Sequence, residues 1–132
     1  MSHMPQSILT AVDFGDASGR AVALSGVIAE RCHVPTFRLL HAETLDVPAY
    51  FTADQIETLE LQRRNMRAQA ERFLSAFGRQ HTPRPFSTLV GDRSPVDAIL
   101  QESADADLVV MGTHGRHAEA MVARIGRRAS AS

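Results

Sequence analysis

Residues 107–115 read Asp-Leu-Val-Val-Met-Gly-Thr-His-Gly, an apolar run that leads directly into a Gly-x-x-Gly loop. The run has the length of a buried strand, and the two glycines leave backbone N–H groups uncovered by side chains. A loop of this kind often accommodates a bulky or charged ligand, most commonly phosphate. Paired glycines after a strand also form simple tight turns, so the meaning of the loop depends on its neighbours.

Three further runs upstream have the composition of buried strands. They cover residues 7–12, 36–41 and 85–90. Ser87 and Thr88 make the last of these more polar, which indicates a position nearer an edge of the sheet. With the run before the Gly-x-x-Gly loop, the sequence predicts four strands.

Helical periodicity separates these strands. One helix follows the turn at residues 13–16, and the longest is predicted over residues 52–77, with Gly78 as its stop. A third helix begins at Ser94, with Pro95 in its first turn, which is a typical helix start. Apolar strands that alternate with amphipathic helices predict an α/β fold with a mainly parallel sheet, doubly wound and covered on both faces.

Composition limits the function classes. The chain has 132 residues, 44% apolar and 22% charged, with a formal net charge of −1. This balance argues against a dedicated nucleic-acid or membrane-surface binder, and no run approaches the roughly 18 apolar residues of a membrane span. Residues 1–4 are interpreted as an expression-vector remnant, and residues 5–132 as a single domain. The single cysteine, Cys32, fits a reducing cytoplasm and is expected to be a packing residue.

Ligands of a doubly wound sheet bind beyond the carboxyl ends of the strands, where the winding direction reverses. If the chain starts centrally and winds outward before returning, the first and fourth strands become neighbours, and they end at Asp13 and Gly112. A carboxylate repels phosphate unless Mg²⁺ lies between them or the carboxylate points at a ribose hydroxyl. Aspartate after a strand also caps the next helix, a task that Asp16 or Ser18 could share. Both roles of Asp13 stay open.

Other chemistries have weaker support. His114 and His117, with His41, are too few for a metal site, because a metal needs more ligands at a recognised spacing. No G-x-S-x-G elbow occurs, and no Ser or Cys has an evident base, so no catalytic residue is assigned. The arginines of the longest helix lie among glutamates, which is typical of a solvated helix face.

Four segments together resemble the universal stress protein family. They are ILTAVD at 8–13, LLHA at 39–42, VGD at 90–92 and ADLVVMGTHGR at 106–116. The resemblance implies a flavodoxin- or Rossmann-like three-layer sandwich with strand order 3-2-1-4, and 5 where a closing strand exists. It further implies a cytoplasmic stress-response regulator or sensor that binds ATP with Mg²⁺ and is usually a homodimer.

In ATP-binding members of this family, adenine lies near the ends of the first two strands, and the phosphates rest on a Gly-x-x-Gly…Gly-Ser/Thr loop. Carried over by position, the residues that would meet adenine and ribose are Ala11, Val12 and Asp13, with Ala42 beside the base. Those that would meet ribose and phosphates are Met111, Gly112, Gly115 and Arg116. Asp13 would reach Mg²⁺ through the nucleotide.

The end of the chain departs from the family pattern. Gly126 is the next glycine after Gly115, and Arg127 stands where a hydroxyl is expected. The preferred alignment takes residues 118–124 as the family's closing helix, so that part of the phosphate loop is missing after His117 and the closing strand is missing after Ile125. The fourth strand would then be an open edge, which a second subunit is expected to cover.

Three candidate functions of the chain are compatible with the sequence. The first is an ATP-binding regulator with at most slow hydrolysis, because no G-x-x-x-x-G-K-[ST] clamp is present. The alternative is a family member that binds no nucleotide and acts through dimerisation or protein partners. An adenylate-forming enzyme of a related fold is the third, and residues 14–16 are a poor substitute for the Ser-Gly-Gly loop it requires.

Overall fold

The computed structural model describes residues 4–43, 47–112 and 120–124, and strands alternate with helices along most of this part of the chain. The strands are β1 (Ser7–Ala11), β2 (Thr36–Ala42), β3 (Ser87–Gly91), β4 (Leu108–Gly112) and β5 (Ala120–Arg124). The helices are α1 (Asp16–Arg31), α2 (Ala53–His81) and α3 (Pro95–Glu102), with the 3₁₀ turn η1 (Ser103–Asp105) after α3.

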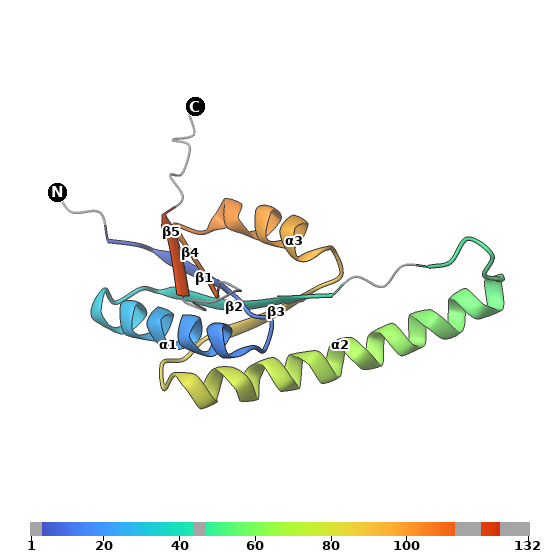
Figure 1. Ribbon diagram of the computed structural model, residues 1–132, viewed down its shortest axis with the longest axis horizontal. Helices are drawn as coiled ribbons and strands as arrows, with labels where there is room; N and C mark the ends of the chain where they lie inside the picture. The colour runs from blue at the N-terminus through green and yellow to red at the C-terminus, as the bar shows by residue number, and fades with distance from the viewer. Residues whose placement is uncertain (1–3, 44–46, 113–119, 125–132) are drawn as a thin grey trace, which may run out of the picture.

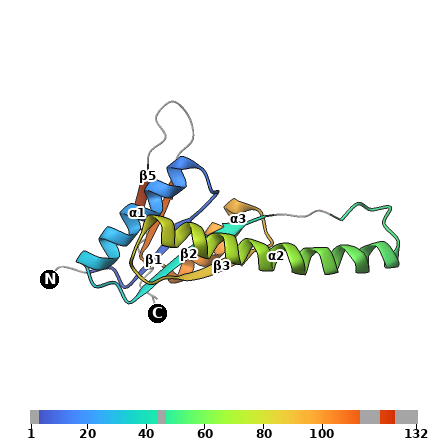
Figure 2. The same ribbon diagram turned by 90° about the horizontal axis from the view of Figure 1, so that it is seen from below.

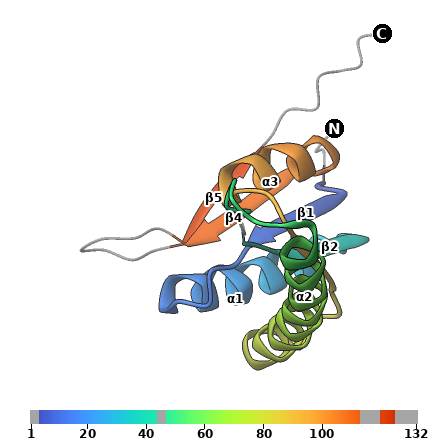
Figure 3. The same cartoon turned by 90° about the vertical axis from the view of Figure 1, so that its right-hand side faces the viewer.

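The strands form one sheet in the order β3-β2-β1-β4-β5. β1 lies in the middle and pairs in parallel with β2 and with β4, so that Thr10 lies beside Leu39 on one side and Val110 on the other. Helices α1 and α2 cover one face of the sheet and α3 covers the other (Figures 1 and 3). The predicted doubly wound fold and its strand order are confirmed, and the carboxyl ends of β1 and β4 are neighbours.

The end of the chain corrects a prediction. Residues 118–124 were expected to form a closing helix, but Ala120–Arg124 is a strand that runs antiparallel to β4. Ala and Arg favour helices locally, yet a five-residue segment cannot hold a helix on its own, and the open edge of β4 offers backbone partners. A fifth strand is therefore present, and β4 is not an edge strand.

The longest helix also differs from its prediction. Gly78 does not stop α2, which continues to His81. Gly78 is buried, and a Cβ there would lie 2.3 Å from Cζ of Phe86 and 2.6 Å from Cδ1 of Leu39. The glycine therefore allows the helix to approach the sheet closely, and the helix ends where Pro83 prevents its continuation.

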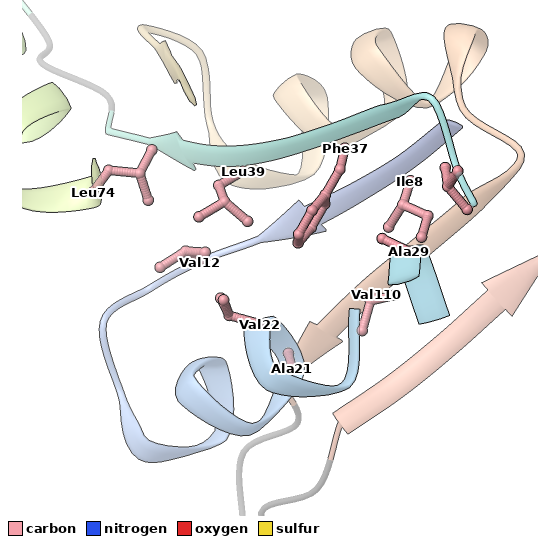
Figure 4. Packing of buried hydrophobic residues seen from close by; sticks show 10 residues of the cluster. Ile8, Val12, Ala21, Val22, Ala29, Phe37, Leu39, Leu74 and Val110 are labelled. Atoms are coloured by element: carbon pink, nitrogen blue, oxygen red, sulfur yellow. The ribbon is translucent and has the colours of Figure 1, made fainter. Parts of the chain in front are cut away.

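Two apolar clusters lie on the two faces of the sheet, because successive strand residues point to opposite sides. The cluster under α1 and α2 includes Ile8, Val12, Phe37, Leu39, Leu74 and Val110 (Figure 4). The cluster under α3 consists of Leu9, Leu40, Ala98, Ala106 and Val109. The central strands are thus buried on both faces, as their continuous apolar runs predicted.

The N-terminal half of α2 extends beyond the sheet, on the side where β2 ends (Figure 2). It carries partly exposed apolar side chains, among them Leu61 and Met66. Even so, none of the described helices combines the length and the apolar composition that crossing a membrane requires.

Candidate functional site

A cavity of about 300 Å³ opens at the carboxyl ends of β1, β2 and β4. This is the lower end of the size range of small-molecule sites. Six of the site residues expected from the sequence line it, namely Ala11, Val12, Asp13, Ala42, Met111 and Gly112. The other two, Gly115 and Arg116, lie outside the described residues. The structure therefore brings the described candidates together around one space.

The sequence analysis missed several lining residues. Pro95 and Ile99 belong to the first turns of α3, and Leu40 belongs to β2. The crossover from β3 to β4 places α3 on the face of the sheet opposite α1, so its N-terminal end reaches the cavity. The sequence predicted the helix start at Ser94, but only the three-dimensional structure shows that Ile99 lines the cavity.

The floor of the cavity is apolar. Leu40 and Ala42 alternate with His41 on β2 and therefore share the α3 face of the sheet, where Met111 and Ile99 also pack. The small side chains of Ala11 and Ala42 leave room above the sheet. An apolar lining of this kind suits an aromatic group better than a compact polar one.

The exposed Asp13 carboxylate lines the cavity and also organises the turn into α1. Its Oδ1 accepts hydrogen bonds from the backbone N–H of Gly15 at 2.9 Å and from Oγ of Ser18 at 2.6 Å. Ser18 Oγ in turn accepts from the backbone N–H of Asp13 at 2.9 Å. The N-cap residue Gly15 has no side chain with which to cap α1. The structural role of Asp13 therefore has direct geometric support, and its place at the cavity leaves a ligand role compatible with it.

The close packing of Gly112 against α1 explains why this position is a glycine, whether or not a ligand binds. A Cβ at this position would lie 2.7 Å from the carbonyl carbon of Ala17 and 2.8 Å from the amide nitrogen of Ser18. These are backbone atoms of the first turn of α1, which cannot move aside as a side chain can. The first glycine of the Gly-x-x-Gly loop therefore serves the packing of β4 against α1 in addition to lining the cavity.

His41 connects the ends of β1 and β2. The residue is buried, with Nδ1 at 2.7 Å from the carbonyl oxygen of Val12 and Nε2 at 2.9 Å from Oε1 of Glu43. Its ring lies 4.5 Å from the ring of Phe14, centroid to centroid. These contacts hold the edge of the cavity in place from the α2 side.

Phe14 occupies the left-handed backbone region, with φ of 66°, which is uncommon for a residue other than glycine. Its ring packs edge-on against Phe73 at 4.9 Å and Phe77 at 5.5 Å, both on α2. Aromatic packing thus stabilises the turn that presents Asp13 to the cavity.

A metal site built from histidines has no support in the described part of the chain. No three His, Cys, Asp or Glu side chains gather there closely enough to hold a metal ion. Both ring nitrogens of His41 already form hydrogen bonds, with the carbonyl oxygen of Val12 and with Oε1 of Glu43. The other two histidines considered from the sequence, His114 and His117, lie outside the described residues.

A family model and several solved structures are similar to this chain. A family model described as the Universal stress protein family matches residues 4–127. Among solved structures, a universal stress protein in complex with cAMP has a TM-score of 0.56 and 19% identity, and the alignment covers 81% of this chain and 72% of that one. Universal stress protein UspA from Lactobacillus plantarum has a TM-score of 0.51 and 19% identity, with 88% and 82% covered. No curated protein sequence matches this chain. At this level of identity the structural likeness establishes the fold.

Proposed function

Because the chain belongs to the universal stress protein family, we propose that it binds an adenine nucleotide, ATP with Mg²⁺, at the carboxyl ends of β1 and β4. In this proposal residues 5–132 act as a single-domain cytoplasmic stress-response sensor or regulator rather than as a fast enzyme. The observation that carries the proposal is the convergence on one cavity of Ala11, Asp13, Ala42 and Gly112, which lie at or just after the carboxyl ends of three different strands.

The apolar lining of the cavity supports an aromatic ligand group. The base would lie against Ala42 and Leu40, between Met111 of β4 and Ile99 of α3. The ribose would lie toward Asp13, whose carboxylate can accept a hydrogen bond from a hydroxyl. One structural neighbour was crystallised with cAMP, which makes adenine nucleotides the first class to test.

The described residues fit Mg²⁺ only together with a nucleotide. Asp13 is the one carboxylate among the described residues that line the cavity. Magnesium is commonly held by one or two carboxylates together with phosphate oxygens and water. Asp13 would therefore hold the metal jointly with the phosphates, and the metal would neutralise part of their charge.

Filling the cavity is expected to weaken nucleotide binding. In Ala42→Phe, the new ring would occupy the floor on which the base is proposed to lie, and we expect at least a tenfold loss of Mg-ATP affinity, about 1.4 kcal/mol. Isothermal titration calorimetry on the two folded proteins measures this loss. The matched control is Ala68→Phe, which adds the same ring on an exposed position of α2 and should leave the affinity unchanged.

The same titration decides between nucleotide binding and the alternative function. An unchanged affinity in folded Ala42→Phe would place the nucleotide elsewhere. If the unmodified protein takes up no adenine nucleotide at all, the proposed ligand is wrong and a role through dimerisation or protein partners is favoured.

We further propose a homodimer. The interface was expected at β4, but β5 covers that side, so the open edge moves to β5. Within the described residues β5 pairs with β4 alone, and its Val122 is 42% exposed. Pairing between two copies would satisfy the outward N–H and C=O groups of this strand. Sedimentation at micromolar concentration is expected to give twice the chain mass, and a monomer would contradict the proposal.

A further inference from the structure

We infer that the exposed side of α2 is a contact surface for a second copy of this chain, with the two α2 helices packed antiparallel. This surface lies apart from the cavity and from the edge of β5. The contact therefore neither requires the proposed nucleotide nor repeats the proposed pairing of β5.

The surface is a single stripe along α2. Its residues follow one another at intervals of three or four positions, which places them on one side of a helix. We call this stripe the outer face of α2, and its six exposed residues are Asp54, Glu57, Leu61, Arg64, Ala68 and Arg72. Leu74 and Gly78, which are buried, mark the side of α2 that packs on the sheet. Seen from below, no described element passes in front of the N-terminal half of this helix (Figure 2).

Charge is segregated along the outer face. Asp54 and Glu57 come before Leu61, whereas Arg64 and Arg72 come after it. Opposite charges three or four positions apart would stabilise the helix, but Asp54, Glu57 and Arg72 have none at those positions. Asp54 and Glu57 instead lie three positions apart and repel each other. The outer face therefore has an acidic end and a basic end.

Other charges of α2 have partners within the chain. Glu60 pairs with Arg63 at 3.3 Å, and Arg67 pairs with Asp92 at 3.4 Å. Among the described residues, no ion pair involves the four charged side chains of the outer face. These four side chains are thus available to a second molecule.

Antiparallel pairing of two copies matches these charges. If the two helices cross at Leu61, the acidic end of each outer face lies on the basic end of the other. Glu57 precedes Leu61 by four positions and Arg64 follows it by three, so Glu57 of one copy lies beside Arg64 of the second copy. Parallel pairing would instead place like charges together. Because one sequence supplies both halves of the match, a second copy is favoured over an unrelated protein.

The size of the outer face sets the strength of the contact. At the crossing point Leu61, which is 57% exposed, would pack on Leu61 of the second copy. A stripe of this length extends about 27 Å along the helix, so one helix pair buries less than the roughly 1,200–2,000 Å² of a standard interface. Exposed ion pairs also contribute little each. We therefore expect weak association, with a dissociation constant on the order of 100 μM.

Charge reversal tests the pairing. Sedimentation equilibrium of the unmodified protein from about 10 to about 500 μM should show a mass that rises with concentration. Glu57→Arg and Arg64→Glu each bring like charges together, and each should weaken this step about threefold or more. An equimolar mixture of the two variants should associate like the unmodified protein, because the new arginine of one chain meets the new glutamate of the other.

The control for net charge is Asp105→Arg. It changes the charge by the same amount as Glu57→Arg, but it lies in η1, which follows α3. This variant should associate like the unmodified protein. Circular dichroism on all three variants confirms that they are folded.

A cross-linking experiment tests the antiparallel direction. Leu61→Cys should form a disulfide between two copies on oxidation with diamide, because residue 61 meets its own counterpart at the crossing. In Ala68→Cys each thiol lies seven positions from the crossing, so the two thiols would be about 21 Å apart and should not link. The unmodified protein, treated in the same way, shows any linkage through Cys32.

Several results would overturn the contact. A mass that does not rise with concentration would do so, and so would a mixture that associates no more strongly than its two components. Equal linkage of Leu61→Cys and Ala68→Cys would contradict antiparallel packing. The pairing of β5 is judged separately, because it sets the mass at micromolar concentration, from which any rise through α2 begins.

Discussion

Gly112→Ala is expected to lower the free energy of unfolding by about 3 kcal/mol. The added Cβ would lie 2.7 Å from the carbonyl carbon of Ala17 and 2.8 Å from the amide nitrogen of Ser18. Because both are backbone atoms of the first turn of α1, relief requires the helix to move away from β4. That movement would also loosen the apolar cluster that α1 forms with Val110.

Urea denaturation followed by circular dichroism measures this loss. The matched control is Gly91→Ala, which changes a glycine at the carboxyl end of β3, where the Cβ would make an ordinary contact at 3.5 Å with Ala98. This control should stay within about 1 kcal/mol of the unmodified protein. Equal effects at Gly91 and Gly112 would show that the close approach of α1 does not determine the cost.

Leu39→Ala is expected to have an effect of similar size, again about 3 kcal/mol. Leu39 is fully buried on β2, where it packs under α2 beside Gly78 and Leu74 (Figure 4). Truncation removes apolar contacts and leaves a cavity in the middle of the larger cluster. The same denaturation experiment gives the change in free energy.

Leu100→Ala is the control for this truncation, because Leu100 on α3 is 66% exposed and its loss should cost about 0.5 kcal/mol or less. A cost at Leu39 no larger than the cost at Leu100 would contradict the packing described here. Because Leu39 lies on the face of the sheet opposite the apolar floor of the cavity, any ligand affinity of the folded variant should change little.

Much of the fold follows from local patterns. The parallel strands β1, β2 and β4 are largely apolar runs because helices bury them on both faces, and such runs are visible without knowledge of any contact. The strand order follows from the alternation of elements together with the direction of crossovers and the family resemblance. Asp13 and Gly112 were placed side by side on the condition that the chain starts centrally, an order that the family resemblance also implied, because the ends of neighbouring parallel strands meet at one edge.

The errors have a common physical origin. Gly78 looks like a helix stop when its own helix is considered alone, but the ring of Phe86 and the side chain of Leu39 explain why a glycine lies inside α2. Residues 120–124 look helical by composition, but the open edge of β4 makes them a strand. In both cases contact with another element decides the conformation.

By itself, the sequence predicted the doubly wound architecture, because that depends on periodicity and the alternation of elements, whereas the position of β1 beside β4 also needed the family resemblance. Only the tertiary structure decided the antiparallel β5, the contribution of Ile99 from α3, and the packing role of Gly112 against α1. These features depend on packing and backbone hydrogen bonds between different elements, and the local sequence pattern of one element does not report such contacts.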